Sequence, residues 1–244
     1  MKTLYRLWPL LVLLMASSCE KDEPAKTTVQ FGSMTLNVTH KVDQAPLLFD
    51  SMMYQNAAGN PFSVSRLYYY ISGIRLYNQE KLMFTSNAIF YIDATSAENK
   101  LLLNYVPTGE YTSATLLIGL AADTNKTGTL PDLIENLNMA WPDEMGGGYH
   151  FMKLEGHYRN TANLKKGFTV HLGTNPSLVQ HQAIPKNFSV TLGQNTPLTL
   201  EMNINEWFAN PYAYNFNTDG NYTMGVALLM QLISNNGKDV FTLR

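Results

Sequence analysis

Cysteine is almost absent from this chain, since Cys19 is the only one among 244 residues. A single thiol excludes an internal disulfide and a cysteine metal cluster. Long apolar runs are also absent: the stretch Leu7–Ala16 is too short to span a bilayer. No serine-centred glycine elbow and no HExxH helix occurs, so a hydrolytic enzyme is the weakest functional class, and we expect no enzymatic activity.

The first nineteen residues have the pattern of an export signal. Lys2 and Arg6 precede the apolar run, and Ser17-Ser18-Cys19 follows it. The segment resembles a bacterial lipoprotein signal, although Ala16 stands where leucine is commoner. We therefore predict removal of residues 1–18 and lipidation of Cys19, with ordinary cleavage or a buried spare thiol as the alternatives. Residues 19–28 would form a tether to a membrane of the bacterial cell envelope, either the outer membrane or a membrane that faces the periplasm.

The remaining chain is predicted to be one acidic domain, residues 29–244. Removal of residues 1–18 leaves 15 basic and 19 acidic residues, a formal charge of −4, so nucleic acid is a poor partner. A single β-sandwich of this length is ordinary. No repeat, coiled coil or low-complexity block divides the sequence.

Alternating apolar and polar residues predict an all-β fold, an antiparallel two-sheet sandwich. Two short helices are expected at Leu130–Leu137, with Pro131 in its first turn, and at Met224–Ile233, although the second segment also suits a buried strand. The expected strands include Val29–Phe31, Leu36–His40, Arg66–Leu76, Ile89–Ile92, Tyr111–Leu120, Tyr149–Tyr158, Phe168–Leu172, Phe188–Leu192 and Leu198–Ile204.

The segment GGGYHFMKLEGHYR, residues 146–159, begins with three glycines, which suit a tight turn, and two histidines and a methionine follow them. Period-two geometry predicts that His150 and Met152 share one strand face and that His157 projects from the other. By default, a lone strand histidine is hydrogen-bonded or solvated and Met152 fills the core.

Two further histidines lie on other predicted strands. His40 ends an apolar stripe in its strand, and His171 lies opposite the apolar set of Phe168–Leu172. Three histidines on three strands can converge at one end of a sandwich, whereas His181 lies in a polar loop. The residues alone therefore predict an exported β-sandwich with a candidate metal site.

Five segments, in order, resemble the MbnP family of exported copper-binding proteins. They are SRLYYYISGIRLYN (65–78), VPTGEYTSATLLIGL (106–120), MAWPDEMGGGYHFMKLEGHY (139–158), FTVHLG (168–173) and MNINEWF (202–208). The resemblance covers nearly the whole chain after Val29. It implies an exported, often lipid-anchored protein of bacterial copper handling, in storage, delivery or sensing. In some members a dihaem partner oxidises a tryptophan to kynurenine, which contributes to copper binding.

Carried over residue by residue, the resemblance implies that His150 and His171 bind copper together with His40. Met152 and a modified Trp141 are further candidate contacts. Members commonly carry two tryptophans before the glycines, whereas this chain has Trp141 alone. Imidazole and thioether donors suit Cu(I) or Cu(II), and three histidines also suit zinc.

The rival interpretation is a surface lipoprotein that binds a glycan or a protein through aromatic side chains. Its candidate residues are Tyr68, Tyr69, Tyr70, Trp207, Tyr212 and Tyr214.

Overall fold

A computed structural model describes residues 28–244 of the chain. The predicted signal, the lipidation of Cys19 and almost all of the predicted tether lie outside the described residues. Within the described part, no helix combines the length and the apolar character needed to cross a membrane.

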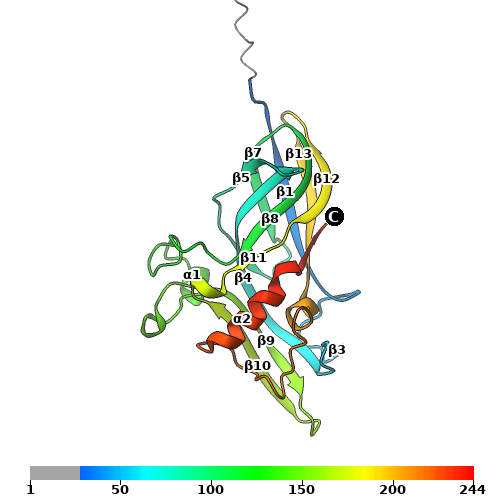
Figure 1. The fold of residues 1–244 in the computed structure, drawn as a ribbon, viewed down its shortest axis with the longest axis vertical. Helices are drawn as coiled ribbons and strands as arrows, with labels where there is room; N and C mark the ends of the chain where they lie inside the picture. Colours follow the sequence, from blue (N-terminus) through cyan, green and yellow to red (C-terminus); the bar gives the residue numbers. More distant parts are fainter. Residues whose placement is uncertain (1–27) are drawn as a thin grey trace, which may run out of the picture.

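The described chain forms two β-sheets with short helices at their edges (Figure 1). In the first sheet the strand order is β14-β13-β1-β2, with β7 also paired to β1; in the second it is β10-β9-β4-β8-β11, with β3, β5 and β6 on β4 and β12 on β8. The strands are β1 (Phe31–Val42), β2 (Ala45–Pro46), β3 (Tyr54–Gln55), β4 (Pro61–Asn78), β5 (Lys81–Thr85), β6 (Phe90–Asp93), β7 (Lys100–Pro107), β8 (Gly109–Ile118), β9 (His150–Arg159), β10 (Lys165–Gly173), β11 (Val179–Gln180), β12 (Ile184–Val190), β13 (Asn195–Asn203) and β14 (Phe241–Leu243). The predicted β-sandwich class is confirmed.

The core forms from the alternate strand residues that sequence periodicity assigned to one face. In β1, Met34, Leu36 and Val38 are buried, while the residues between them are partly exposed. Aromatic rings fill the part of the core near β10, where Phe168 stacks on Phe216 with ring centroids 4.6 Å apart. Edge-to-face contacts with Phe208 extend this cluster.

One strand pair differs from the antiparallel prediction. β1 and β13 are parallel, with Leu36 opposite Leu198 and Val38 opposite Leu200. More than 150 residues separate these partners in the sequence, so no tight hairpin imposes an antiparallel direction. The other strand pairs described are antiparallel.

Both predicted helices are present with shifted boundaries. α1 (Ile134–Asn138) begins three residues after Pro131, so the placement of Pro131 in its first turn was wrong. α2 (Ala227–Asn236) packs against β10 and is a helix rather than a buried strand. α2 therefore lies against β10, and Tyr70 of β4 donates a hydrogen bond to Asn136 of α1.

Candidate metal site

A register shift between β9 and β10 decides which side of the sheet His150 occupies. Leu172 pairs with Met152, but the next residue, Gly173, pairs with His150, so Phe151 has no partner. Such a bulge reverses the alternation of side chains beyond it. The prediction that His150 and Met152 share a face was therefore wrong.

The bulge places the rings of His150 and His171 against each other. Their ring centroids lie 5.0 Å apart at an interplanar angle of 87°. His171 faces away from the core, because it pairs with Lys153 while its neighbour Leu172 is fully buried. Two of the three predicted ligands thus meet on the outer face of β9 and β10, beneath the loop that contains residues 139–148.

Each imidazole uses one nitrogen for a hydrogen bond that fixes its tautomer. His150 Nδ1 donates to the backbone carbonyl oxygens of Met139 (3.2 Å) and Ala140 (3.1 Å). His171 Nε2 donates to Glu155 Oε1 at 2.9 Å, and Arg66 Nη1 donates to the other oxygen of Glu155 at 2.7 Å. The second nitrogen of each neutral ring then carries a lone pair.

Those two lone-pair nitrogens are the unusual feature of the site. His150 Nε2 and His171 Nδ1 are buried and have no hydrogen-bond partner. Buried polar atoms are nearly always satisfied, and two adjacent exceptions need an explanation. Two neighbouring imidazoles, each oriented by a hydrogen bond at its other nitrogen, match the arrangement of metal-binding histidines.

Burial and charge keep His150 in the form that can bind a metal. Loss of solvent lowers the pKa of His150 to about 3, and the nearby positive charge of Lys153 acts in the same direction. The Lys153 ammonium is held by a hydrogen bond to the carbonyl oxygen of Asn138. The hydrogen bond from His171 to Glu155 lowers the pKa of the Glu155 carboxyl group. Burial opposes this shift, and the positive charge of Arg66 adds to it. Glu155 is therefore an ionised acceptor at neutral pH.

Trp141 packs against the histidine pair. Its ring centroid lies 4.7 Å from that of His150, and its indole Nε1 donates to the carbonyl oxygen of Met145 at 3.2 Å. The other face of the indole occupies space above Gly173, where a Cβ atom would lie 2.2 Å from Trp141 Cε3. A glycine at 173 is thus needed for the observed position of Trp141.

The glycine run explains how Trp141 reaches this position. Gly146, Gly147 and Gly148 all have positive φ angles, of 104°, 66° and 88°. This turn allows Trp141 N to donate to Gly148 O at 2.9 Å and His150 N to donate to Met139 O at 2.6 Å. The glycine run therefore folds residues 139–141 back onto the start of β9.

His40 and Met152 lie elsewhere. His40 Nε2 is 2.8 Å from the hydroxyl of Tyr69, a fully buried residue that pairs with Met152 in the sheet. Met152 is fully buried and pairs with Leu172, on the face opposite His171. Within residues 28–244, no three His, Cys, Asp or Glu side chains are grouped as a metal site requires. The expected cluster of three histidines is not formed, because the bulge moves His150 off the core face.

The two histidines expected to lie away from the site, His157 and His181, lie on the strand face and in the loop predicted for them. His157 shares the outer face with Lys153 and Glu155, and its Nδ1 is 3.4 Å from Ser65 Oγ. His181 lies in the loop between β11 and β12, and its side chain is buried rather than exposed to solvent. Its Nδ1 donates to Gln182 O, and its Nε2 accepts from the backbone N–H of Phe241 at 2.9 Å. Both ring nitrogens of His181 are satisfied, so His181 is a structural residue.

Most of the aromatic residues of the rival interpretation are unavailable for surface binding. Tyr69, Tyr70, Trp207 and Tyr214 are no more than 1% exposed. Tyr212 is 45% exposed, whereas Tyr68 is partly buried in β4. These side chains are dispersed between core and surface and do not form one exposed platform.

The comparisons with known proteins agree with this architecture. The family model described as MbnP matches residues 31–225. A solved structure, MbnP from Methylosinus trichosporium, aligns with a TM-score of 0.53 at 13% sequence identity, covering 88% of this chain and 99% of that one. At this identity the alignment shows a shared fold. A search of curated proteins finds no match. Because the family match spans most of the chain, from the start of β1 to the loop before α2, this protein belongs to the MbnP family.

Proposed function

We propose that this protein binds copper through His150 and His171 and acts in bacterial copper handling as an exported, lipid-anchored protein without enzymatic activity. The observation that carries the proposal is the pair of buried, unpartnered nitrogens, His150 Nε2 and His171 Nδ1, on rings whose centroids are 5.0 Å apart. The donor set fits copper, because imidazole is a good ligand for both Cu(I) and Cu(II), and zinc is the alternative metal.

Glu155 and the carbonyl groups of Met139 and Ala140 would serve as orienting groups. They hold each ring nitrogen that faces away from the metal as an N–H donor, which keeps the other nitrogen free to coordinate. Copper would supply one-electron redox chemistry or simply be held as cargo. His40 and Met152 are not part of the proposed site, since each is committed elsewhere.

The charge of the covering segment also supports cation binding. Residues 121–149, which include the contacts of Trp141 with His150, carry five acidic residues and one basic residue. The acidic residues are Asp123, Asp132, Glu135, Asp143 and Glu144, and the basic residue is Lys126. A local excess of negative charge raises the concentration of cations near the entrance to a site.

Trp141 is the residue that a dihaem cytochrome-type partner would oxidise. Its indole is 2% exposed and contacts His150, so a changed ring there would stand beside the metal. Peptide mass spectrometry of protein from its native host, with and without that partner, tests this part. Conversion to kynurenine is expected only when the partner is present, and an unmodified Trp141 in both samples would contradict it.

Copper titration of purified protein tests the central proposal. All variants would carry Cys19→Ser, so that no thiol competes for metal. His150→Ala and His171→Ala should each weaken binding by more than about 100-fold, beyond the 10–100-fold typical of lost outer-sphere groups. His157→Ala is the matched control, since His157 lies on the same strand as His150 and outside the pair. Wild-type affinity in either of the first two variants would refute the assignment.

The anchor is tested separately. In cells, Cys19→Ser should release the protein from the membrane fraction or leave the signal segment uncleaved. A membrane fraction identical to that of wild type would contradict lipidation.

A further inference from the structure

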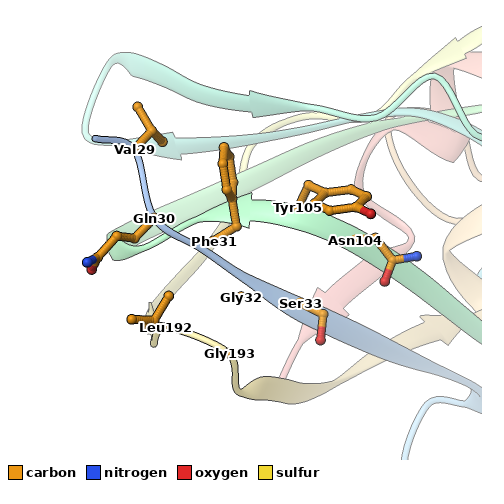
Figure 2. Close-up of a pocket in the computed structure, with 9 residues that line it drawn as sticks. All are labelled: Val29, Gln30, Phe31, Gly32, Ser33, Asn104, Tyr105, Leu192 and Gly193. Atoms are coloured by element: carbon orange, nitrogen blue, oxygen red, sulfur yellow. The ribbon is translucent and has the colours of Figure 1, made fainter. Parts of the chain in front are cut away.

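A surface with four exposed apolar side chains lies at the end of the sandwich where the chain enters the domain. We call it the entry tip. It surrounds an open pocket of about 660 Å³. Figure 2 shows its side chains around the start of β1. The lining residues, none of them charged, are Val29, Gln30, Phe31, Gly32, Ser33, Asn104, Tyr105, Leu192 and Gly193.

Large apolar side chains of the entry tip are exposed to solvent. Tyr105 is 77% exposed, Val29 58%, Leu192 55% and Phe31 42%. The rings of Phe31 and Tyr105 touch edge to face, with centroids 6.3 Å apart. Contiguous exposed apolar side chains on a soluble domain mark a surface that contacts a partner or a membrane.

The backbone directs Tyr105 outward at a cost in stability. β1 and β7 lose register between Gly32 and Met34, and Tyr105 has a φ of 55°, in the left-handed region. A bulky residue is rarely found there, because its side chain crowds the backbone. Glycine or asparagine would suit this bulge better in an isolated domain, so the exposed tyrosine is not explained by folding.

We propose that the entry tip rests on the lipid bilayer to which Cys19 is anchored; this inference rests on the lipid anchor of the proposed function. Cys19 and Val29 are ten residues apart, so covalent geometry holds the tip within about 35 Å of an acylated Cys19. Tyrosine at the headgroup level, beside apolar side chains that reach toward the acyl chains, is typical of interfacial contacts. The absence of charge in the pocket lining agrees with a lipid surface.

This placement orients the whole domain. The turn between β9 and β10 lies at the opposite end of the long axis from the incoming chain (Figure 1). With the entry tip on the bilayer, that turn points away from the membrane. The loops that cover His150 and His171 then remain accessible to soluble partners.

Site-specific fluorescence in vesicles tests the proposal. Leu192→Cys and Leu164→Cys are matched variants, because Leu192 at the entry tip is 55% exposed and Leu164 in the β9–β10 turn is 57% exposed. Acylation consumes the only natural thiol, so each variant has one free cysteine for an environment-sensitive dye. The full-length acylated proteins would be reconstituted in phosphatidylethanolamine–phosphatidylglycerol vesicles.

The dye at position 192 should shift its emission to shorter wavelength and be quenched by lipids that carry a headgroup nitroxide, whereas the dye at 164 should do neither. Equal responses at the two positions would overturn the proposal and leave the anchor intact. Dye uptake by wild-type protein at Cys19 would refute the anchor, and with it the assignment of the bilayer. A shift at 192 that appears without vesicles and grows with protein concentration would identify a second copy as the occupant and overturn the proposal.

Discussion

The contact between Gly173 and Trp141 gives the sharpest structural prediction. In Gly173→Ala, the new Cβ would lie 2.2 Å from Trp141 Cε3 and 2.4 Å from Cζ3. Real Cβ atoms do not approach a ring so closely, and the backbone of β10 and the indole are both held by neighbours. The indole must therefore move away from β10, and its contact with His150, now 4.7 Å between ring centroids, must change.

The expected cost follows from overpacking of a filled space. Extra methyl groups in well-packed interiors typically cost about 1–3 kcal/mol. With a urea dependence near 2 kcal/mol per molar, the unfolding midpoint should fall by about 0.5–1.5 M. Gly167→Ala in the same strand is the control, because its nearest neighbour, Gly156 O, would be 3.9 Å from the added Cβ. We expect that control to change stability by less than about 0.5 kcal/mol.

Urea denaturation followed by circular dichroism measures both variants, and a double-mutant cycle identifies the cause. Trp141→Leu removes the large ring, so Gly173→Ala should cost much less in that background than in wild type. If Gly173→Ala matches Gly167→Ala in stability, the packing of Trp141 on β10 is wrong. An unchanged cost in the Trp141→Leu background would show that the clash lies elsewhere.

Three further predictions use other parts of the structure. Glu155→Ala should weaken copper binding by about 10–100-fold while leaving the fold intact, and Glu155→Gln, which keeps an acceptor oxygen for His171, should weaken it less; equal affinities in all three proteins would exclude an orienting role. Burial lowers the pKa of His40 to about 4, with the Asp93 charge opposing, so folding favours the neutral ring and the stability it contributes is complete above pH 6.5 and lost as pH falls toward 4. The loss is at most about 3 kcal/mol. In His40→Gln, the free energy of unfolding measured by urea titration should vary less with pH across that range than in wild type, and an equal variation with pH would contradict the argument. Tyr105→Asn should raise the free energy of unfolding by up to about 1 kcal/mol by relieving the left-handed φ, and a clear destabilisation would contradict the strain argument.

The sequence by itself determined the β-sandwich class and most of the strands. Alternation of apolar residues is a local property, and it survives folding wherever one strand face packs on a core, as it does for Met34, Leu36 and Val38 of β1. The glycine run at 146–148 also predicted its own turn, because three successive positive φ angles suit few residues besides glycine.

Strands with weak alternation were missed. β7 carries KLLLNYVP, in which three consecutive leucines hide the period, and β5 and β14 are short. The parallel pairing of β1 with β13 joins residues more than 150 positions apart, and local pattern contains no information on such a partner.

Only the tertiary structure decided which histidines meet. A single unpaired residue, Phe151, reverses the face of His150 and brings it to His171, and a bulge of this kind depends on the partner strand. His40, on a strand of the other sheet, lies beside Tyr69 and apart from the pair. Residue types and strand positions could predict three candidate ligands. The choice among them depends on register and on the loop that holds Trp141 over Gly173, which arise from contacts between segments distant in sequence.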